Sequence, residues 1–101
     1  MNIPKRVRIC GMTFDVIYKK DLTDDKGQPL LGLCDVNECK IWLKKGLVPE
    51  KRKEVFLHEC LHGILDNLNV TLGKTDKENE DKVNAVGLEL MTFIKVNKIR
   101  L

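Results

Sequence analysis

The chain is organised around residues 55–65, Val55-Phe56-Leu57-His58-Glu59-Cys60-Leu61-His62-Gly63-Ile64-Leu65. This stretch holds both histidines of the protein, in the pattern His-Glu-x-x-His. Residues four apart lie on one face of a helix, so His58 and His62 can bind one zinc ion through their imidazole nitrogens. Glu59 comes one position round the helix, where its carboxylate can accept a proton from an activated water. The alternative is a surface helix that carries two histidines by chance.

Length and composition predict one small, water-soluble globular domain spanning residues 1–101. With 101 residues, 43% hydrophobic and 33% charged, the chain can form a modest core but not a second substrate-binding lobe. No apolar run approaches the roughly 18 residues that cross a bilayer, so no membrane association is expected. The basic start, Met1 to Arg6, lacks the apolar segment of a secretory signal. These features predict a cytoplasmic protein.

Four cysteines, Cys10, Cys34, Cys39 and Cys60, are expected to be reduced thiols. Cys60 lies inside the proposed metal-binding helix, and nothing in the sequence indicates an oxidising compartment. Cys34 and Cys39 flank a turn, as in structural zinc sites, but no further Cys or His pair remains to complete four ligands. Half-buried thiols are the favoured interpretation, and their further roles stay open.

The net charge of +3 comes from 18 basic and 15 acidic residues whose signs are interspersed. The one basic cluster, Lys44, Lys45, Lys51, Arg52 and Lys53, is typical of a solvated surface around the start of a helix. No helix-turn-helix, RNA-binding or OB pattern accompanies it. The sequence therefore does not favour nucleic acid as a partner.

Alternating polar and apolar residues predict two β-hairpins. The first joins Lys5–Ile9 to Met12–Tyr18, and the second joins Leu30–Asp35 to Lys40–Lys44. The polar segment Asp21–Pro29 between them is expected to be an exposed loop. A strand beside the metal-binding helix could also be an edge that accepts an extended peptide.

The same alternation assigns side chains to the two faces of the predicted sheet. In the second hairpin, Ile41 and Leu43 share one face and Trp42 lies on the other. In the first hairpin, the residues expected to face the core are Val7, Ile9, Phe14, Val16 and Tyr18. Both hairpins can thus contribute to one buried face.

A helix is predicted from Pro49 or Glu50 to about Leu68. Pro49 suits the first turn of a helix, where its missing N–H is not needed. Apolar residues recur at steps of three and four, and the expected core face comprises Leu57, Leu61, Ile64, Leu65 and Leu68. The two histidines then lie on the flank of this face.

A second helix is predicted from about Asp76 to about Asn97. Thr75-Asp76-Lys77-Glu78 has the Thr-x-x-Glu form of a capping box. Gly87 would allow close approach of a neighbouring helix. The expected core stripe comprises Val83, Val86, Leu90, Met91 and Ile94. Together the elements predict an α+β fold, in which an antiparallel or mixed sheet of about four strands packs against two helices.

A catalytic zinc ion takes three protein ligands, so a third ligand is needed besides the histidines. Glu80 is favoured, because it lies on or beside the face of the second helix that meets the first. Asp66 shares the first helix with the histidines but lies a full turn farther along its axis. Glu78 is expected to be occupied by the cap, and Asp81 and Glu89 lie farther round. A surface role for Glu80 is the alternative.

Residues 57–65, followed by Glu80-Asp81-Lys82-Val83-Asn84, resemble the small HExxH metallopeptidase-like proteins of bacteriophages and prophages. These proteins are similar to the ImmA/IrrE group of zinc peptidases, in which a Glu-x-x-Ala-Asn segment supplies the third ligand. Glu80-x-x-Val83-Asn84 matches that segment, with Val in place of Ala. The resemblance implies a minimal zincin-like core of the gluzincin type and, for a phage-encoded protein, the cytoplasm of the bacterial host.

The function implied is zinc-dependent hydrolysis of peptide bonds in a peptide or protein substrate. One Zn²⁺ per chain, held by His58, His62 and Glu80, would activate water while Glu59 acts as the general base. The chain has no His or Tyr after Glu80 to stabilise an oxyanion, and Tyr18 is its only tyrosine. The alternative is a zinc-bound interaction module with weak or no catalysis, acting on a phage or host regulatory protein. Substrate, cleavage specificity and oligomeric state do not follow from the sequence.

Overall fold

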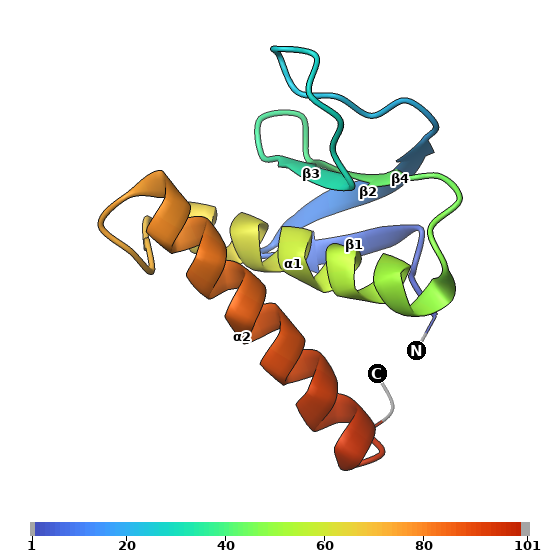
Figure 1. Ribbon diagram of the computed structural model, residues 1–101, viewed down its shortest axis with the longest axis vertical. Coiled ribbons are helices and arrows are strands. Elements are labelled where there is room, and N and C mark those ends of the chain that lie inside the picture. Colours follow the sequence, from blue (N-terminus) through green and yellow to red (C-terminus); the bar gives the residue numbers. More distant parts are fainter. Residues whose placement is uncertain (1, 100–101) are drawn as a thin grey trace.

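Both predicted hairpins form, and together they make one four-stranded sheet (Figure 1). The computed structural model describes residues 2–99. Its strands are β1 (Arg6–Ile9), β2 (Met12–Lys19), β3 (Gly32–Asp35) and β4 (Lys40–Lys44). The strand order is β1-β2-β4-β3; each hairpin is antiparallel, and β2 pairs with β4 in parallel. The sheet is therefore mixed, and β1 and β3 are its edges.

Each hairpin has a turn that explains its register. Cys10 and Gly11 connect β1 to β2 with φ angles of 50° and 82°, the left-handed pair that a two-residue hairpin turn requires. In the second hairpin, the Asp35 carboxylate accepts the Glu38 N–H at 3.0 Å. Cys39 then adopts a φ of 53°, which brings the chain back into β4.

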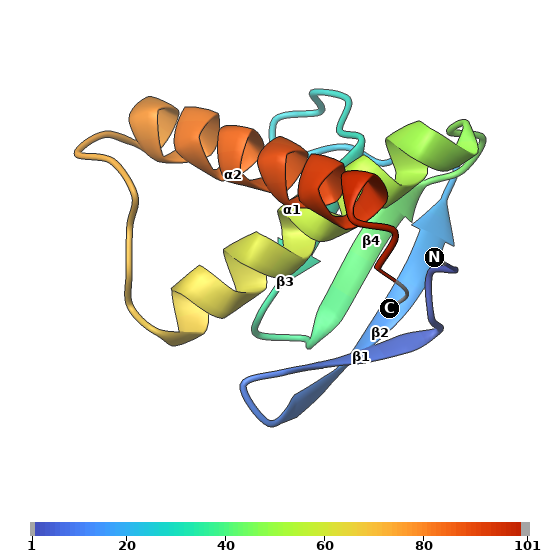
Figure 2. The ribbon, with the colours of Figure 1, turned by 90° about the horizontal axis from the view of Figure 1, so that it is seen from below.

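The two helices form successive layers on one face of the sheet. Helix α1 (Pro49–Asn67) packs on the sheet, and α2 (Asp76–Val96) packs on α1 (Figure 2). Proline at the start of α1 and a Thr75 hydroxyl that accepts the Glu78 N–H at 3.1 Å agree with the predicted boundaries. The α+β fold of four strands and two helices is confirmed. Within residues 2–99, neither helix is long and apolar enough to cross a membrane.

The core lies between the sheet and α1. Its buried residues come from β1, β2, β4 and α1, and they are Ile9, Phe14, Ile41, Leu43, Val55 and Phe56. The shared face predicted for Ile41 and Leu43 is confirmed, because both side chains are fully buried. Tyr18 was expected there too but is 38% exposed. It lies near the end of β2 and lines a surface pocket with Pro49 and Arg52 from the start of α1.

The core face predicted for α1 is wrong. The buried residues of this helix face the sheet, and they are Val55, Phe56, Glu59 and Gly63. Of the predicted leucine-rich stripe, Ile64 is 37% exposed and Leu68 is 59% exposed. The reason is that α1 is a middle layer: its sheet side includes a glycine and a carboxylate, while the leucine side faces α2 and solvent.

The stripe predicted for α2 is only partly buried. Val83 and Gly87 are buried, as expected for the crossing with α1. Val86 and Leu90 were expected in the core but are 45% and 38% exposed. The C-terminal half of α2 still meets α1 on one side, where Met91 and Ile94 line a pocket with Leu57, and Lys95 pairs with Glu50 at 3.2 Å. Within residues 2–99, no further layer covers the other sides of this helix (Figure 1).

The loop between the hairpins is more ordered than expected. Leu22 is buried, and Thr23 and Pro29 form an isolated antiparallel bridge. The Asp24 carboxylate accepts the N–H groups of Lys26 and Gln28 at 2.8 and 2.9 Å, which closes the turn. The prediction of a fully exposed loop is therefore wrong at Leu22.

Candidate metal centre

Helix α1 presents its two histidines on the side that faces α2. The Nε2 atoms of His58 and His62 lie 3.1 Å apart, and the rings meet edge to face with centroids at 4.7 Å. Both side chains are half-buried. One helical turn thus brings two imidazole nitrogens together, as the spacing predicted.

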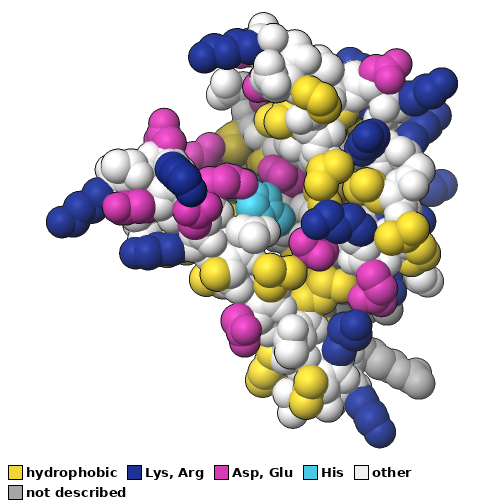
Figure 3. All heavy atoms as spheres, viewed as in Figure 1, with side chains coloured by type: hydrophobic (Ala, Val, Ile, Leu, Met, Phe, Trp, Pro, Cys, Tyr) yellow, Lys and Arg dark blue, Asp and Glu magenta, His cyan; other side chains and the backbone are white. Residues whose placement is uncertain are grey.

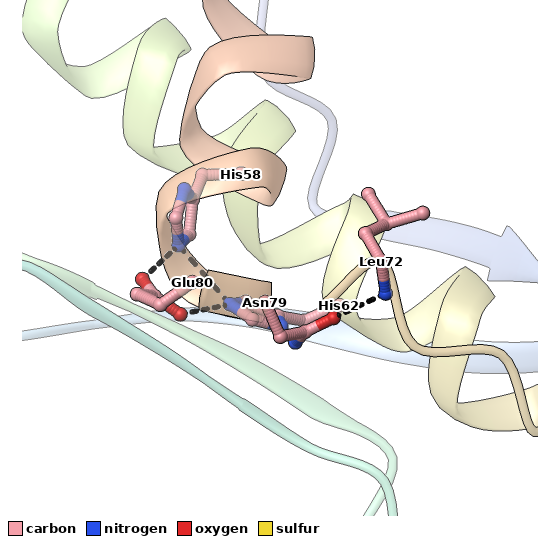
Figure 4. A network of polar contacts seen from close by, with 5 residues as sticks. All are labelled: His58, His62, Leu72, Asn79 and Glu80. Atoms are coloured by element: carbon pink, nitrogen blue, oxygen red, sulfur yellow. Dashed lines mark hydrogen bonds and ion pairs between the residues drawn. The ribbon is translucent and has the colours of Figure 1, made fainter. Parts of the chain in front are cut away.

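Helix α2 brings Glu80 onto both histidines (Figure 4). One carboxylate oxygen lies 2.6 Å from His58 Nε2, and the other lies 2.8 Å from His62 Nε2. The three side chains can each offer one ligand atom, and these atoms lie within 4.8 Å of one another. Within residues 2–99, this is the one group of three or more such side chains.

The start of α2 is held in a fixed place relative to the loop before it. The Asn79 side-chain oxygen accepts the Leu72 N–H at 2.7 Å (Figure 4), and the Glu78 carboxylate accepts the Lys74 N–H at 2.9 Å. Gly73 permits this approach, because a Cβ at that position would lie 2.7 Å from the Asn79 nitrogen. The loop therefore determines where the next residue, Glu80, points.

The donor set of two imidazoles and one carboxylate fits a divalent metal ion such as zinc. Zinc binds imidazole nitrogen and carboxylate oxygen at about 2.0–2.2 Å, which separates tetrahedral donors by about 3.3 Å. The donor atoms here are 2.6–3.1 Å apart, so side-chain shifts of a few tenths of an ångström would admit the ion. The group could therefore hold a metal ion.

Glu59 lies beneath the two histidines, on the side of α1 that faces β3. It is 8% exposed, the one buried charged residue in the described part of the chain. Burial and, second, the charge of Glu80 raise the pKa of this carboxyl to about 7, while a hydrogen bond from the Cys34 backbone N–H lowers it. A carboxyl with such surroundings can hold a proton near neutral pH.

Edge strand β3 runs directly beside Glu59 because of a glycine. A Cβ on Gly32 would lie 2.5 Å from Val55 Cγ1 and 3.0 Å from Glu59 Cγ, so any larger residue would move the strand away. Leu31 C=O accepts the Lys44 N–H on β4. Since backbone groups alternate along a strand, Gly32 and Cys34 direct theirs away from β4, and the Cys34 N–H is the one that Glu59 accepts.

Two clefts meet at the metal centre. The Lys51 cleft, of about 230 Å³, is lined by residues that include Lys51, Glu54 and Asn84. The Asp66 cleft, of about 380 Å³, is lined by residues that include Leu33, Cys34 and Asp66. Both clefts also contain Leu30, Gly32, Glu59 and Glu80. Figure 3 shows the histidines at the surface between acidic side chains.

All four cysteines are free thiols, as expected. Burial, and then the charge of Glu59, raises the pKa of Cys34 to about 12. The same two causes raise the pKa of Cys60 to about 12. Cys39 points its sulfur at the Val36 carbonyl at 3.6 Å. None of the cysteines belongs to a group of metal ligands among residues 2–99.

The other predicted candidates lie apart from the three candidate metal ligands. Tyr18 lines neither of the two clefts. Asp81 pairs with Lys77 at 2.9 Å, and Asp66 lines the cleft without reaching the histidines' nitrogens. Asn84 belongs to the Glu80-x-x-Val83-Asn84 segment but was given no role from the sequence, and it lines the Lys51 cleft. Its position four residues after Glu80 on one helix was the available signal.

Comparisons with protein-family models, curated proteins and solved structures found no match to this chain. The assignment of the site therefore rests on its own geometry and chemistry.

Proposed function

We propose that this protein is a zinc-dependent peptidase, similar to the ImmA/IrrE group, that hydrolyses a peptide bond with Glu59 as the general base. The observation that carries the proposal is the convergence of His58, His62 and Glu80 directly beside a buried carboxylate. A structural metal site has no need of an uncoordinated carboxylate at this position. A hydrolytic site needs one within reach of the attacking water.

The open edge of β3 supports a peptide as the substrate. An extended peptide can pair with an exposed strand through backbone hydrogen bonds. Gly32 directs its N–H and C=O to this edge, between the two clefts and next to Glu59. Side chains on either side of the scissile bond would then enter the Lys51 cleft and the Asp66 cleft.

The proposed reaction is the addition of water to the scissile carbonyl followed by loss of the amine. Bound zinc would supply Lewis-acid polarisation of the carbonyl and lower the pKa of water. Glu59 takes one proton from the attacking water while the water oxygen forms a bond to the carbonyl carbon. The C–N bond then breaks, and Glu59 passes the proton to the leaving nitrogen, which gives a carboxylate product and an amine product.

Asn84 is our candidate for the group that stabilises the oxyanion. Its side-chain amide can donate hydrogen bonds, and the residue lines the Lys51 cleft together with His58 and Glu59. In subtilisin, loss of one oxyanion donor costs about 10²–10³-fold in kcat. We expect Asn84→Ala to lower kcat in this range while zinc content stays unchanged.

One observation favours a second candidate, a zinc-bound interaction module without catalysis. Within residues 2–99, no tyrosine lines either cleft, and the only histidines that do so are the two proposed ligands. A module of this kind would bind a regulatory protein through the same groove. Glu59→Gln would then leave partner binding unchanged, because no proton transfer is involved.

The test combines metal analysis with cleavage of a synthetic peptide library, read by mass spectrometry. Untagged protein should contain about one zinc per chain. Glu59→Gln should keep the zinc and lose cleavage. The matched control is Glu89→Gln, which removes an exposed carboxylate on α2 outside both clefts and should keep zinc and cleavage. Protein without zinc, or full cleavage by Glu59→Gln, would overturn the proposal.

A further inference from the structure

The face of the sheet that points away from α1 has no layer over it within residues 2–99. Helix α1 covers the opposite face, and α2 packs on α1 rather than on any strand (Figure 2). We propose that this uncovered face binds single-stranded nucleic acid. The residues that form it come from all four strands, so only the strand pairing brings them together.

The register places an apolar row across the middle of this face. Ile17 on β2 pairs with Trp42 on β4, and Leu33 on β3 pairs with Trp42 from the other side. Paired residues point to the same face of a sheet, so the three side chains lie next to one another. Trp42 is thus central, and its ring is the one indole of the chain.

Basic side chains flank this apolar row on both sides along the strands. Lys19 and Lys44 pair with each other, two residues after Ile17 and Trp42 on their strands, and Lys40 lies two residues before Trp42. Residues two apart on one strand point to the same face and lie about 7 Å from each other. The Nζ atoms of Lys19 and Lys40 both lie 5.8 Å from the centroid of the Trp42 ring. An aromatic ring therefore lies between two cationic groups.

The charge of this face is strongly one-sided. The register assigns to it five basic residues, Arg6, Arg8, Lys19, Lys40 and Lys44, against two acidic residues, Asp15 and Asp35. One of the acids, Asp15, is already paired with Arg6 at 3.2 Å. The net charge of +3 on this face equals the formal net charge of the whole chain. The rest of the molecule is therefore balanced overall.

A single strand of nucleic acid fits this arrangement better than a duplex. Its unpaired bases can stack on an aromatic side chain, while lysines on either side contact the phosphates. In a duplex the base faces are covered by neighbouring base pairs, so an aromatic side chain cannot stack on them without unstacking the duplex. The basic cluster noted in the sequence around residues 44–53 shares only Lys44 with this face and contains no aromatic residue, so the cluster does not carry this inference.

The test is a fluorescence titration of the protein, with chelator present, against a thymidine oligomer and a uridine oligomer of about 15 nucleotides. Binding should quench the emission of Trp42 and weaken with salt. Tighter binding of the thymidine or the uridine oligomer would identify DNA or RNA as the natural ligand. A duplex of the same length should bind at least about tenfold more weakly.

Variants separate stacking from general charge attraction. Trp42→Leu should weaken binding about tenfold, and Trp42→Phe should restore most of it. Lys19→Glu and Lys40→Glu should each weaken binding and lower the salt slope by about 0.7. Lys82→Glu on α2 makes the same charge change elsewhere and should leave binding unchanged. If Trp42→Leu fails to fold, the lysine variants decide.

Three results would overturn the inference. One is the lack of any binding to both oligomers at low salt. Another is equal weakening by Lys82→Glu and Lys40→Glu, which would indicate attraction to net charge alone. The third is binding of polyglutamate as tightly as the oligomers without quenching of Trp42, which would identify an acidic protein surface as the partner.

Discussion

Glu59 is the residue at which the sheet, α1 and the metal centre meet. Glu59 directly follows His58 in the sequence, its side chain is buried beside β3, and the residue lines both clefts. Gly32 makes this possible, because the missing Cβ lets the strand approach Glu59 Cγ. A carboxyl group that its neighbours hold in this way has a defined orientation, which the proposed role as general base requires.

At the same scale, Glu80 should be essential for metal affinity. Glu80→Ala removes both oxygens that face the histidines, so we expect zinc affinity to fall by at least about 100-fold. Asp81→Ala is the matched control, since Asp81 pairs with Lys77 instead. Competition with a fluorescent zinc chelator measures both variants. Equal affinities for the two variants would remove Glu80 from the ligand set.

Cys34 should react slowly with alkylating reagents. Its pKa, raised to about 12 by burial and by the charge of Glu59, lowers the reactive thiolate fraction about 1,000-fold relative to the ordinary value of 9.0. Cys10 is exposed in a turn. At about pH 8, iodoacetamide followed by peptide mass spectrometry should show Cys10 modified at least about tenfold faster. Equal rates would contradict the burial of Cys34.

The raised pKa of Cys34 also predicts that the protein loses stability in alkali. The folded state holds the Cys34 proton more tightly than the unfolded chain does. The contribution of this protonated thiol to the free energy of unfolding is therefore complete below about pH 9. That contribution is lost as the pH rises towards about 12. Urea titrations in this range should show a smaller alkaline loss for Cys34→Ala than for the natural chain. Parallel curves would contradict the prediction.

At the scale of elements, α1 is a helix with two different packing sides. The sheet side is made by Val55, Phe56, Glu59 and Gly63, and the opposite side carries the histidines and leucines toward α2. Helix α2 crosses it with Gly87 near Leu61 and stays linked to it by the Lys95–Glu50 ion pair at 3.2 Å. Only one side of α2 is covered, so few of its apolar residues are buried. The metal centre lies where the two helices are close.

Two glycines beside this helix pair should respond oppositely to alanine. A Cβ on Gly87 would lie 3.6 Å from Leu61 Cδ1, an ordinary contact, so Gly87→Ala should raise the free energy of unfolding by about 0.5–1 kcal/mol. A Cβ on Gly73 would lie 2.7 Å from the Asn79 backbone nitrogen, so Gly73→Ala should lower it by about 1–3 kcal/mol.

Urea denaturation of the metal-free chains measures both effects. Gly73→Ala should also weaken zinc binding, because the displaced loop carries the start of α2 and therefore Glu80 with it. Gly87→Ala should leave zinc affinity unchanged. The same sign for both stability changes would show that the loop and the helix crossing are packed differently from this structure.

At the scale of the whole molecule, three layers create two separate surfaces. The metal centre lies between α1, α2 and the edge of β3, and the basic face with Trp42 lies on the far side of the sheet. Because α2 packs on α1 and on no strand, its attachment depends on the helix crossing, on the Lys95–Glu50 ion pair and on the group that could hold a metal ion. A metal ion bound by His58, His62 and Glu80 would link α2 to α1.

Removal of zinc should therefore loosen α2 more than the sheet. Chelation of zinc-loaded protein should lower Tm by at least about 5 °C, since a ligand stabilises the state that binds it. Hydrogen exchange should increase more in Asp76–Val96 than in the central strands β2 and β4. Unchanged exchange in α2 would contradict a metal bridge between the helices.

Much of the fold and half of the site can be predicted from local patterns. The strands, helix boundaries and α+β class follow from alternation, Pro49 and the Thr75 cap, because these are properties of neighbouring residues. The closeness of His58 and His62 follows in the same way from helical spacing. The buried side of α1 did not follow, because its sheet side carries Glu59 and Gly63 instead of the leucines that mark hydrophobic periodicity.

The sequence by itself determined the chemistry: two imidazoles, an adjacent carboxylate and the helix that joins them. Only the tertiary structure decided what surrounds that helix. The helix crossing sets Glu80 against both histidines, Gly32 sets β3 against Glu59, and strand pairing sets Lys19 and Lys40 around Trp42. The physical reason is the distance along the chain over which each kind of contact acts. Spacing within one element fixes local geometry, whereas contacts between elements depend on the packing of the whole core.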